Sequence, residues 1–465
     1  MSKLVWRVKL VAELEPGVVS ETELVRIERE AQASLAELGL RLDEAKRLTA
    51  ALQAQLVPGQ VTALGKSRRS CEACGQVLAS KGHYAATFRS LFGDVPVRVR
   101  RRLACPCQGA CEAKSRTVLG LGKDALAPEL AYLTARYAAL APFGRVAALF
   151  SELLPLGGAQ HASTVRNRTL RVGAEVVQAH TAGTTTRQPA AQASGPVVVG
   201  LDGGYVRDRH RAEGRRFEVV AGKVIGASGA QHRFAFARTG PTATAEAFRA
   251  ALAAVGVDAN TPATVLCDGD AGLWRLQRKV LPGAAVVLDW WHAAVRFEHA
   301  LQAARGLGTG PDEASLADAA VRGLERAKWR LWHGRWSGCR RRLAALCRWT
   351  RRRPMRDVAG VDKLRQHVAG LLGYLEPNGA ALVHYAARRR RGEPIATSFV
   401  ESAVDEIISW RMAKAQQMRW SKPTLQPFLD VRTAVLNDTL EDAFRRRHHG
   451  FRPANDDHRL TAVAA

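Results

Sequence analysis

The chain has 465 residues, more than one compact core accommodates, so we expect roughly two to four domains. Hydrophobic residues make up 47% of it, which excludes wholesale disorder, and 69 Lys and Arg against 43 acidic residues give a net charge of +26 that attracts polyanions. The N-terminus lacks the apolar stretch of a signal peptide and no segment is apolar enough to span a bilayer, so we expect a cytoplasmic protein with no membrane partner.

Residues 1–65 are predicted to form an N-terminal helical region. Within it, residues 20–56 carry apolar side chains at helical spacing, and Ser20 with Glu23 is typical of a capping box. The resulting apolar stripe favours packing on the body of the protein, with packing on a second copy as the alternative.

Residues 66–115 are predicted to form a zinc-ribbon-like module, because two close cysteine pairs are separated by the length of a β-hairpin. The predicted ligands are Cys71, Cys74, Cys105 and Cys107, with Cys111 and then His83 as further candidates. Four thiolates suit a closed tetrahedral Zn²⁺, which would fold the module and take no part in catalysis. Reduced free cysteines are the alternative.

Residues 116–180 have a helix–turn–helix-like pattern, with a Gly-Gly turn before a second helix that Ser163 is predicted to cap. Arg166 and Arg168 on that helix are candidate DNA-binding residues, as are Asn167 and Arg171. A plain αα-hairpin has the same pattern. A polar linker is expected at residues 181–194.

The rest of the chain is predicted to form an α/β core with an interruption. Residues 195–304 have the order βββαβαβα, which is typical of a ribonuclease-H-like core. Residues 305–395 form an all-helical insertion rich in Arg and Trp, whose tryptophans at 329, 332 and 336 favour its core over a base-stacking surface. Residues 396–445 complete the core, and residues 446–465 form a tail.

Candidate catalytic acids follow the predicted strands. Asp202, Asp268 and Asp289 each end a short apolar run, and Glu401 begins a helical pattern. Such acids can converge to hold two Mg²⁺ (or Mn²⁺) ions about 4 Å apart, the arrangement used for phosphodiester chemistry. Asp202 would bridge both ions, with Asp268 and Glu401 each holding one.

Several nearby residues compete for these roles or support them. Asp270 competes with Asp268, Asp208 with Asp202, and Asp405 with Glu401. Asp268 and Asp202 are preferred because they end the apolar runs directly, and Glu401 because it lies nearer the start of its helix. His292, in the motif LDWWH with Asp289, is predicted either to make a structural hydrogen bond or to lie near the scissile phosphate, and the sequence leaves both open.

At these motifs the chain resembles the DDE transposases of bacterial insertion sequences, specifically the ISKra type within the Mutator-like superfamily. The resemblance rests on the cysteine motifs and on LDGGYVR, LCDGDAGLW, LDWWH, KWRLWHG and FVESAVDEIISWRMAKAQQMRWS. It implies a ribonuclease-H-like core with an all-α insertion before the glutamate, and the triad Asp202, Asp268 and Glu401. Relatives often have Gly-Ser-Gly before the last acid, where this chain has bulkier residues, including Thr397; Ser398 is the predicted N-cap.

We therefore expect an enzyme that binds the terminal inverted repeats of its element as double-stranded DNA, cuts them and joins them to target DNA. Arg411, Lys414 and Arg419 follow Glu401 and are candidate phosphate contacts. The resemblance implies at least a homodimer on DNA, near the bacterial nucleoid. The alternatives are a transposase-derived DNA-binding regulator without catalysis and a metal-dependent nuclease of the same fold.

Overall fold

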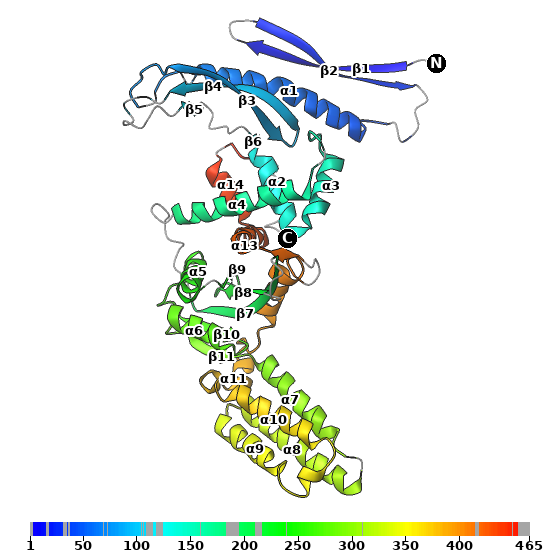
Figure 1. Cartoon of the computed structure of the whole chain (residues 1–465), viewed down its shortest axis with the longest axis vertical. Coiled ribbons are helices and arrows are strands. Elements are labelled where there is room, and N and C mark those ends of the chain that lie inside the picture. Colours follow the sequence, from blue (N-terminus) through cyan, green and yellow to red (C-terminus); the bar gives the residue numbers. More distant parts are fainter. Residues whose placement is uncertain are drawn as a thin grey trace. The chain divides into compact units, whose positions relative to one another are not determined.

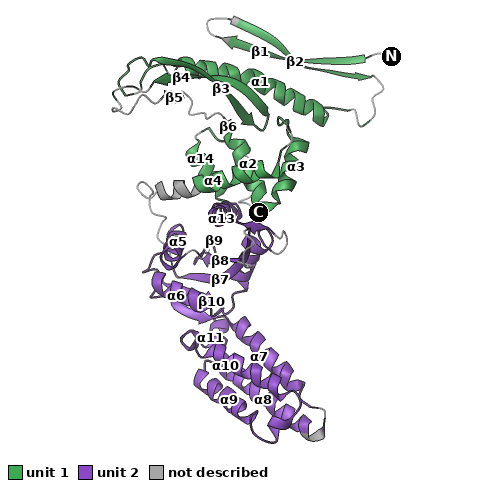
Figure 2. Cartoon of the chain, in the orientation of Figure 1, with its two compact units in different colours: residues 1–176, 438–465 green, residues 177–437 purple. Residues whose placement is uncertain are grey.

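The chain folds into two compact units (Figure 2). The computed structural model describes residues 3–453 except 15–17, 31–34, 36–37, 68, 72, 104, 106, 108–114, 118–123, 159, 183–194, 210–215, 239, 309, 414–417 and 449. Unit 1 comprises residues 1–176 and 438–465, and unit 2 comprises residues 177–437. No helix in this described part of the chain is both long enough and apolar enough to cross a membrane.

Unit 1 begins with an antiparallel hairpin, not with the predicted helix (Figure 1). Its first elements are β1 (Lys3–Leu14), β2 (Val18–Glu30) and α1 (Leu42–Ser67). The helix predicted from residue 20 is therefore wrong up to residue 30, and the Ser20–Glu23 pair lies in a strand. Val25 pairs with Val8 and Ile27 with Trp6, because β-branched and aromatic side chains pack well across strands.

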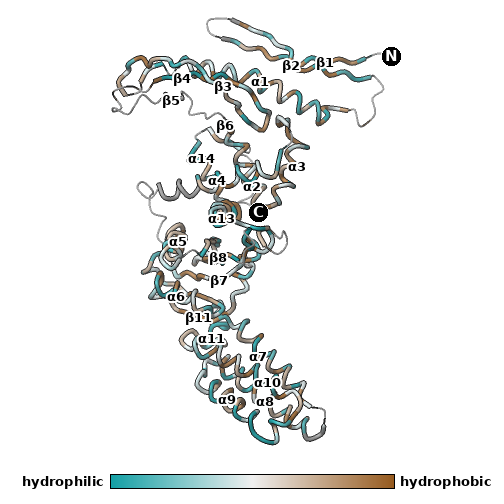
Figure 3. Tube along the Cα trace, in the orientation of Figure 1, coloured by the Kyte–Doolittle hydropathy of each residue, from teal (hydrophilic) through white to brown (hydrophobic). Residues whose placement is uncertain are grey.

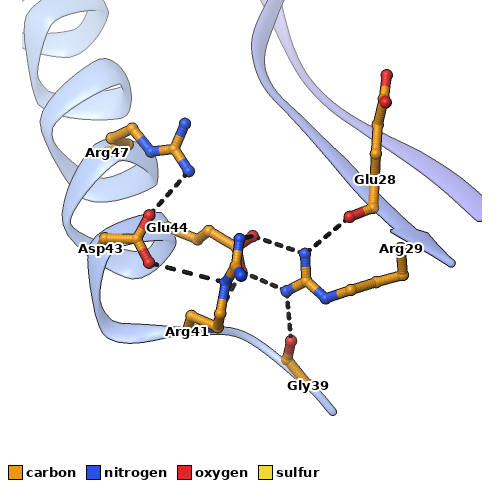
Figure 4. A network of polar contacts seen from close by, with 7 residues as sticks. All are labelled: Glu28, Arg29, Gly39, Arg41, Asp43, Glu44 and Arg47. Carbon is orange, nitrogen blue, oxygen red and sulfur yellow. Dashed lines mark hydrogen bonds and ion pairs between the residues drawn. The ribbon is translucent and has the colours of Figure 1, made fainter. Parts of the chain in front are cut away.

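A buried ion pair joins this hairpin to α1 (Figure 4). The Arg29 guanidinium donates two hydrogen bonds to Glu44, at 2.7 Å and 2.6 Å, and a third to the Gly39 carbonyl at 3.0 Å. Arg41 donates to Glu44 from its backbone and its side chain. These bonds, led by those from Arg29, lower the pKa of Glu44 to about 2.

The cysteine module is a small sheet in the order β5-β4-β3-β6. Its strands are β3 (Ser80–Ser90), β4 (Gly93–Leu103), β5 (Ser115–Thr117) and β6 (Asp124–Leu126). Val57 of α1 packs on the inward-facing residues of β4, among them Val95, Val97 and Val99. The predicted hairpin between the two cysteine pairs is confirmed.

Four helices complete unit 1: α2 (Pro128–Leu140), α3 (Phe143–Leu153), α4 (Ala162–Ala182) and α14 (Leu440–Arg447). Because α4 begins at Ala162, Ser163 lies inside its first turn and is not the N-cap. The C-terminal segment packs as part of this unit: Phe444 and Phe451 lie edge-on to Tyr132, and Phe451 is 1% exposed. The tail predicted from residue 446 is therefore wrong as far as residue 453, and residues 438–445 do not belong with the core.

Unit 2 contains a mixed sheet in the order β11-β10-β7-β8-β9. Its elements are β7 (Val197–Asp208), β8 (Arg216–Ile225), β9 (Gln231–Ala237), α5 (Pro241–Ala253), β10 (Ala263–Cys267), α6 (Ala271–Val280), β11 (Ala285–Leu288) and α7 (Trp290–Arg305). This is the predicted element order. β7 pairs antiparallel with β8 and parallel with β10, and the strands are mostly hydrophobic because both faces are covered (Figure 3).

The described residues of the predicted insertion form helices joined by turns and loops, and none of them is in a strand (Figure 1). Its helices are α8 (Pro311–Trp332), α9 (Trp336–Trp349), α10 (Val361–Leu375) and α11 (Tyr385–Arg390). They pack with α7 and share one hydrophobic core with the sheet. Trp332 and Trp336 pack against this core as predicted, whereas Trp329 is 60% exposed, so the three do not act as one stripe.

After the insertion the chain returns to the sheet. The returning elements are α12 (Ser398–Val404), the π-helix η7 (Asp405–Ser409), β12 (Arg419–Trp420) and α13 (Lys422–Leu436). β12 pairs in parallel with the end of β7, and α13 packs on β9. The return therefore brings residues near 401 and 420 onto the strand that carries Asp202.

Candidate active site

Asp202 and Asp268 lie side by side on the sheet. Asp202 is in the middle of β7, so the prediction that it ends a strand is wrong; β7 continues because its antiparallel pairing with β8 runs to Arg207. Its parallel neighbour β10 ends at Cys267, opposite Leu201, and Asp268 follows directly. Asp268 Oδ1 accepts a hydrogen bond from the Asp270 backbone N–H at 3.0 Å, which fixes the Asp268 carboxylate at the end of β10.

Glu401 reaches the same place because glycines in β7 let α12 approach. Gly200 and Gly204 share a face of β7 with Asp202, since side chains alternate along a strand. A Cβ on Gly200 would lie 1.8 Å from Val400 Cγ2, and one on Gly204 would lie 2.5 Å from Ile408 Cδ1. The helix and the π-helix after it therefore rest directly on the backbone around Asp202.

The acids affect one another's protonation. Burial raises the pKa of Asp202 to about 6, and the charges of Asp268 and Glu401 add to this rise against a hydrogen bond from the Gly203 N–H. Beside them lies a cavity of about 600 Å³, lined among others by Asp202, Tyr205, Arg207, Arg216, Glu401 and Asp405. A lining that combines acids with arginines suits a cation together with an anionic substrate.

Asp289 organises a hydrogen-bonded group beside Glu401. It is fully buried, caps α7 by accepting from the Trp291 N–H at 2.6 Å, and accepts from His292 Nδ1 at 2.7 Å and from the Thr397 hydroxyl. The other ring nitrogen of His292 lies 4.0 Å from Glu401 Oε1. The hydrogen bond to Asp289 raises the pKa of His292, which favours an imidazolium facing the acids.

This group joins the two roles that the sequence left open for His292: it is hydrogen-bonded in the structure and it also faces the site. Burial alone would raise the pKa of Asp289, but the bonds from His292 and Thr397 outweigh it and lower that pKa. Thr397 is the N-cap residue of α12, so Ser398 is not. From the sequence, Thr397 was only one of the bulky residues before Glu401. Its hydrogen bond to Asp289, 108 residues away, was not predicted.

Helices of the insertion hold the strand ends of the site. The Tyr374 hydroxyl of α10 donates to the Asp268 carbonyl at 2.8 Å, and the Tyr385 hydroxyl of α11 donates to the Leu288 carbonyl at 3.0 Å. Gly269 has a φ of +99°, and a Cβ there would lie 3.1 Å from the Tyr374 ring. The insertion therefore fixes the backbone that carries Asp268 and Asp289.

The competing acids occupy different positions. Asp270 caps α6 by accepting from two backbone N–H groups, at 2.8 Å and 2.9 Å, so its carboxylate serves the helix. Glu406, the neighbour of Asp405 in sequence, was not among these candidates and pairs with Arg233. Asp208 ends β7 beside β12. Asp405 lines the same cavity as Glu401 and remains a neighbour of the site.

The predicted DNA contacts divide into three groups. Arg411 is 1% exposed and its guanidinium lies 5.0 Å from the centre of the Phe428 ring, so the predicted phosphate contact is wrong. Arg419 is exposed in β12, as a phosphate contact requires, and Lys414 lies outside the described residues. Arg166 and Arg168 lie on α4 in unit 1.

The cysteine module contains a second candidate metal centre. The Sγ atoms of Cys71, Cys74, Cys105 and Cys107 lie within 4.8 Å of one another. Cys71 and Cys107 are 3.6 Å apart, and Cys74 and Cys105 are 3.4 Å apart. These four cysteines can hold a metal such as zinc, because four thiolates form a closed tetrahedral donor set.

The two other predicted ligands have different outcomes. Cys111 lies outside the described residues. His83 accepts a hydrogen bond from Arg100 and is not part of the group. Within the described part of the chain, no other set of three or more His, Cys, Asp or Glu residues brings its ligand atoms this close together, so Asp202, Asp268 and Glu401 are more widely spaced.

Neither a protein-family model nor a curated protein sequence matches this chain. The geometry of its own residues therefore carries the argument for function.

Proposed function

We propose that this protein is a DDE-type transposase with a ribonuclease-H-like core and an all-α insertion. It would bind the terminal inverted repeats of its insertion sequence, cut the DNA and join the freed 3′ end to target DNA as a homodimer or larger assembly. The observation that supports the proposal is that Asp202 on β7, Asp268 directly after the parallel strand β10, and Glu401 on α12 lie near enough for their charges to act on one another.

Asp202, Asp268 and Glu401 fit a divalent metal centre. Carboxylate oxygens are the ligands that Mg²⁺ or Mn²⁺ prefers. The pKa of Asp202 is raised mainly by burial and further by the charges of Asp268 and Glu401, and a bound cation would offset both effects. Asp202 would be shared between two ions, with Asp268 and Glu401 each holding one. Bound there, the metal would lower the pKa of the attacking water or hydroxyl and stabilise the leaving oxygen.

The protein's own groups would position the substrate. Arg207 and Arg216, paired across β7 and β8, both line the cavity and would bind phosphates that flank the scissile bond. His292, held by Asp289, would keep Glu401 oriented through a charged contact. Arg419 would add a phosphate contact beside the same strand.

Strand transfer with labelled element ends tests the proposal. We expect Asp202→Asn to abolish cutting and joining while end binding stays within about threefold of wild type, because the substitution keeps the side chain's shape and removes its charge. Asp208→Asn, an equal change on the same strand, should keep all three activities. Cutting without joining by the wild type would indicate a nuclease, and binding without cutting would indicate a regulator.

Loss of end binding in Asp202→Asn along with strand transfer would contradict the proposed role, since it would make the residue structural.

A further inference from the structure

Unit 1 contains a second polar cavity, on the helix predicted to contact DNA. Its volume is about 360 Å³. It lies between the end of β3, the turn before α4 and the first half of α4. The polar side chains that line it are Arg89, Gln160, Thr164, Asn167, Arg168 and Arg171. No acidic residue is among the described residues of its lining.

Four of these side chains form one face of α4. Thr164, Asn167, Arg168 and Arg171 follow the i, i+3, i+4, i+7 spacing that places residues on one side of a helix. Arg166 lies on another side and does not line the cavity. The helix therefore presents hydroxyl, amide and guanidinium groups together. The Arg166 guanidinium, which does not line the cavity, donates a hydrogen bond to Asn167 Oδ1 at 3.2 Å.

Arg89 is held in the opposite wall. It forms an ion pair with Asp94, and its strand pairs at this position with Leu126 of β6. Gly157 of the turn packs tightly there, because a Cβ on it would lie 2.9 Å from Asp94 Oδ2. Asp94 thus balances the charge of Arg89, and the net positive charge of the lining comes from the arginines of α4.

The lining is organised before any ligand binds. Arg168 Nη1 donates to Gln160 Oε1 at 3.2 Å, so the amide group of Gln160 is turned with its acceptor toward an arginine. Its NH₂ group remains available as a donor. Gln160 itself is fixed by a hydrogen bond from its backbone N–H to Ser151 Oγ at 3.2 Å. Donor groups therefore predominate around the cavity.

We propose that this cavity binds a backbone phosphate of DNA. A phosphodiester carries charged acceptor oxygens and no donors, which matches a lining of guanidinium, amide and hydroxyl groups. Contacts of this kind fix the register of a protein on a duplex without selecting its sequence. The proposal rests on the proposed DNA partner and is independent of the catalytic acids. It assigns the phosphate contact to Arg171 and Arg168, with Arg89 contributing from the sheet.

The test compares Arg171→Ala with Arg166→Ala in the full-length, zinc-loaded protein. Both variants remove one positive charge from the same helix, and Arg171 is exposed, so its loss should leave folding unchanged in a thermal melt. Binding is measured by fluorescence anisotropy on an element end and on an unrelated duplex of equal length, over a range of salt concentrations. Calorimetric titration with inorganic phosphate forms a separate arm.

We expect Arg171→Ala to weaken binding about tenfold on both duplexes and to reduce the slope of log K against log salt by about 1. Arg166→Ala should change both values much less. Equal losses in the two variants would overturn the proposal, because the effect would then be one of general surface charge. Inorganic phosphate that binds through Arg171, with DNA affinity unchanged in Arg171→Ala, would also overturn it in favour of a free anion.

These outcomes are separate from those for catalysis. If wild-type protein binds DNA through Arg171 but never cuts it, the cavity assignment holds and the proposed function fails. If Arg171→Ala binds as wild type does while wild type cuts and joins, the cavity assignment fails and the function holds.

Discussion

Gly200→Ala tests how Glu401 is positioned. The new Cβ would lie 1.8 Å from Val400 Cγ2 and within 2.9 Å of the Phe399 ring, whereas ordinary van der Waals contact begins at 3.4 Å. Relief along that direction requires α12 to move by about 1.6 Å, the difference between 3.4 Å and 1.8 Å. Overpacking of this kind costs about 1–3 kcal/mol, and a shift of about 1 Å at a reacting group can cost about a hundredfold in rate.

We therefore expect Gly200→Ala to reduce strand transfer at least about a hundredfold and to lower the unfolding temperature only modestly. Gly226→Ala is the matched control, because Gly226 lies just after β8, outside the site, and its Cβ would meet no atom closer than 3.8 Å. Adding Val400→Ala to Gly200→Ala should restore part of the activity by removing the clashing methyl group. Full activity in Gly200→Ala, measured beside that control, would refute the docking of α12 on β7 as the determinant of Glu401's position.

Three further predictions concern charge and metal. The pKa of Asp202 is raised to about 6, so the native state becomes less stable as pH rises through that value. Asp202→Asn should therefore unfold at a higher temperature than wild type at pH 8 without divalent cations. It should also lose the stabilisation that Mg²⁺ gives wild type. Identical melting curves for the two proteins would contradict this. The pKa of Glu44 is lowered to about 2 from 4.5, so the stability that its ion pair contributes is present above pH 4.5 and is lost as pH falls toward 2. Glu44→Gln should lower the stability of unit 1 at pH 7, and the stability of the variant should depend less on pH between 4.5 and 2. Chelation of zinc, or Cys74→Ser, should increase hydrogen exchange in β4 and leave β10 protected, since the four cysteines flank the hairpin that contains β4 and are far in sequence from β10. Unchanged exchange in β4 would count against a structural metal.

The elements whose sequence pattern fits only one structure could be predicted from the sequence. Strand β10 is a short apolar run because both faces of a central parallel strand are buried. Strand β11, at the edge of the sheet, is apolar as well, and each run ends directly before an aspartate. The cysteine pairs flank a hairpin, and the four thiols gather into a cluster that could hold a metal such as zinc. In both cases local spacing carries the information.

Where a pattern fits two periods, the sequence could not decide. Residues 18–30 alternate charged and apolar side chains in a way that satisfies both helix and strand, and most of this hairpin is exposed, so no single buried face selects a period. Arg411 follows a π-helix, whose wider turn changes the direction of later side chains from that of a regular helix. The Arg411 side chain is therefore buried in the protein.

Long-range contacts also escaped prediction. The bond between Thr397 and Asp289 joins the start of α12 to the end of β11, and nothing near either residue indicates it. Phe451 lies in a segment rich in Arg and His that resembles a solvated tail, yet it is buried against Tyr132 from the first third of the chain. Only tertiary packing distinguishes such residues from exposed ones.

The most direct test of the central claim is the binding of Mn²⁺, counted by electron paramagnetic resonance at pH 8. If Asp202, Asp268 and Glu401 together form a two-metal centre, wild type should bind about two ions, and Asp202→Asn, Asp268→Asn and Glu401→Gln should each lose at least one. Asp208→Asn should bind as many ions as wild type does. Unchanged Mn²⁺ binding in all three acid variants would contradict the account.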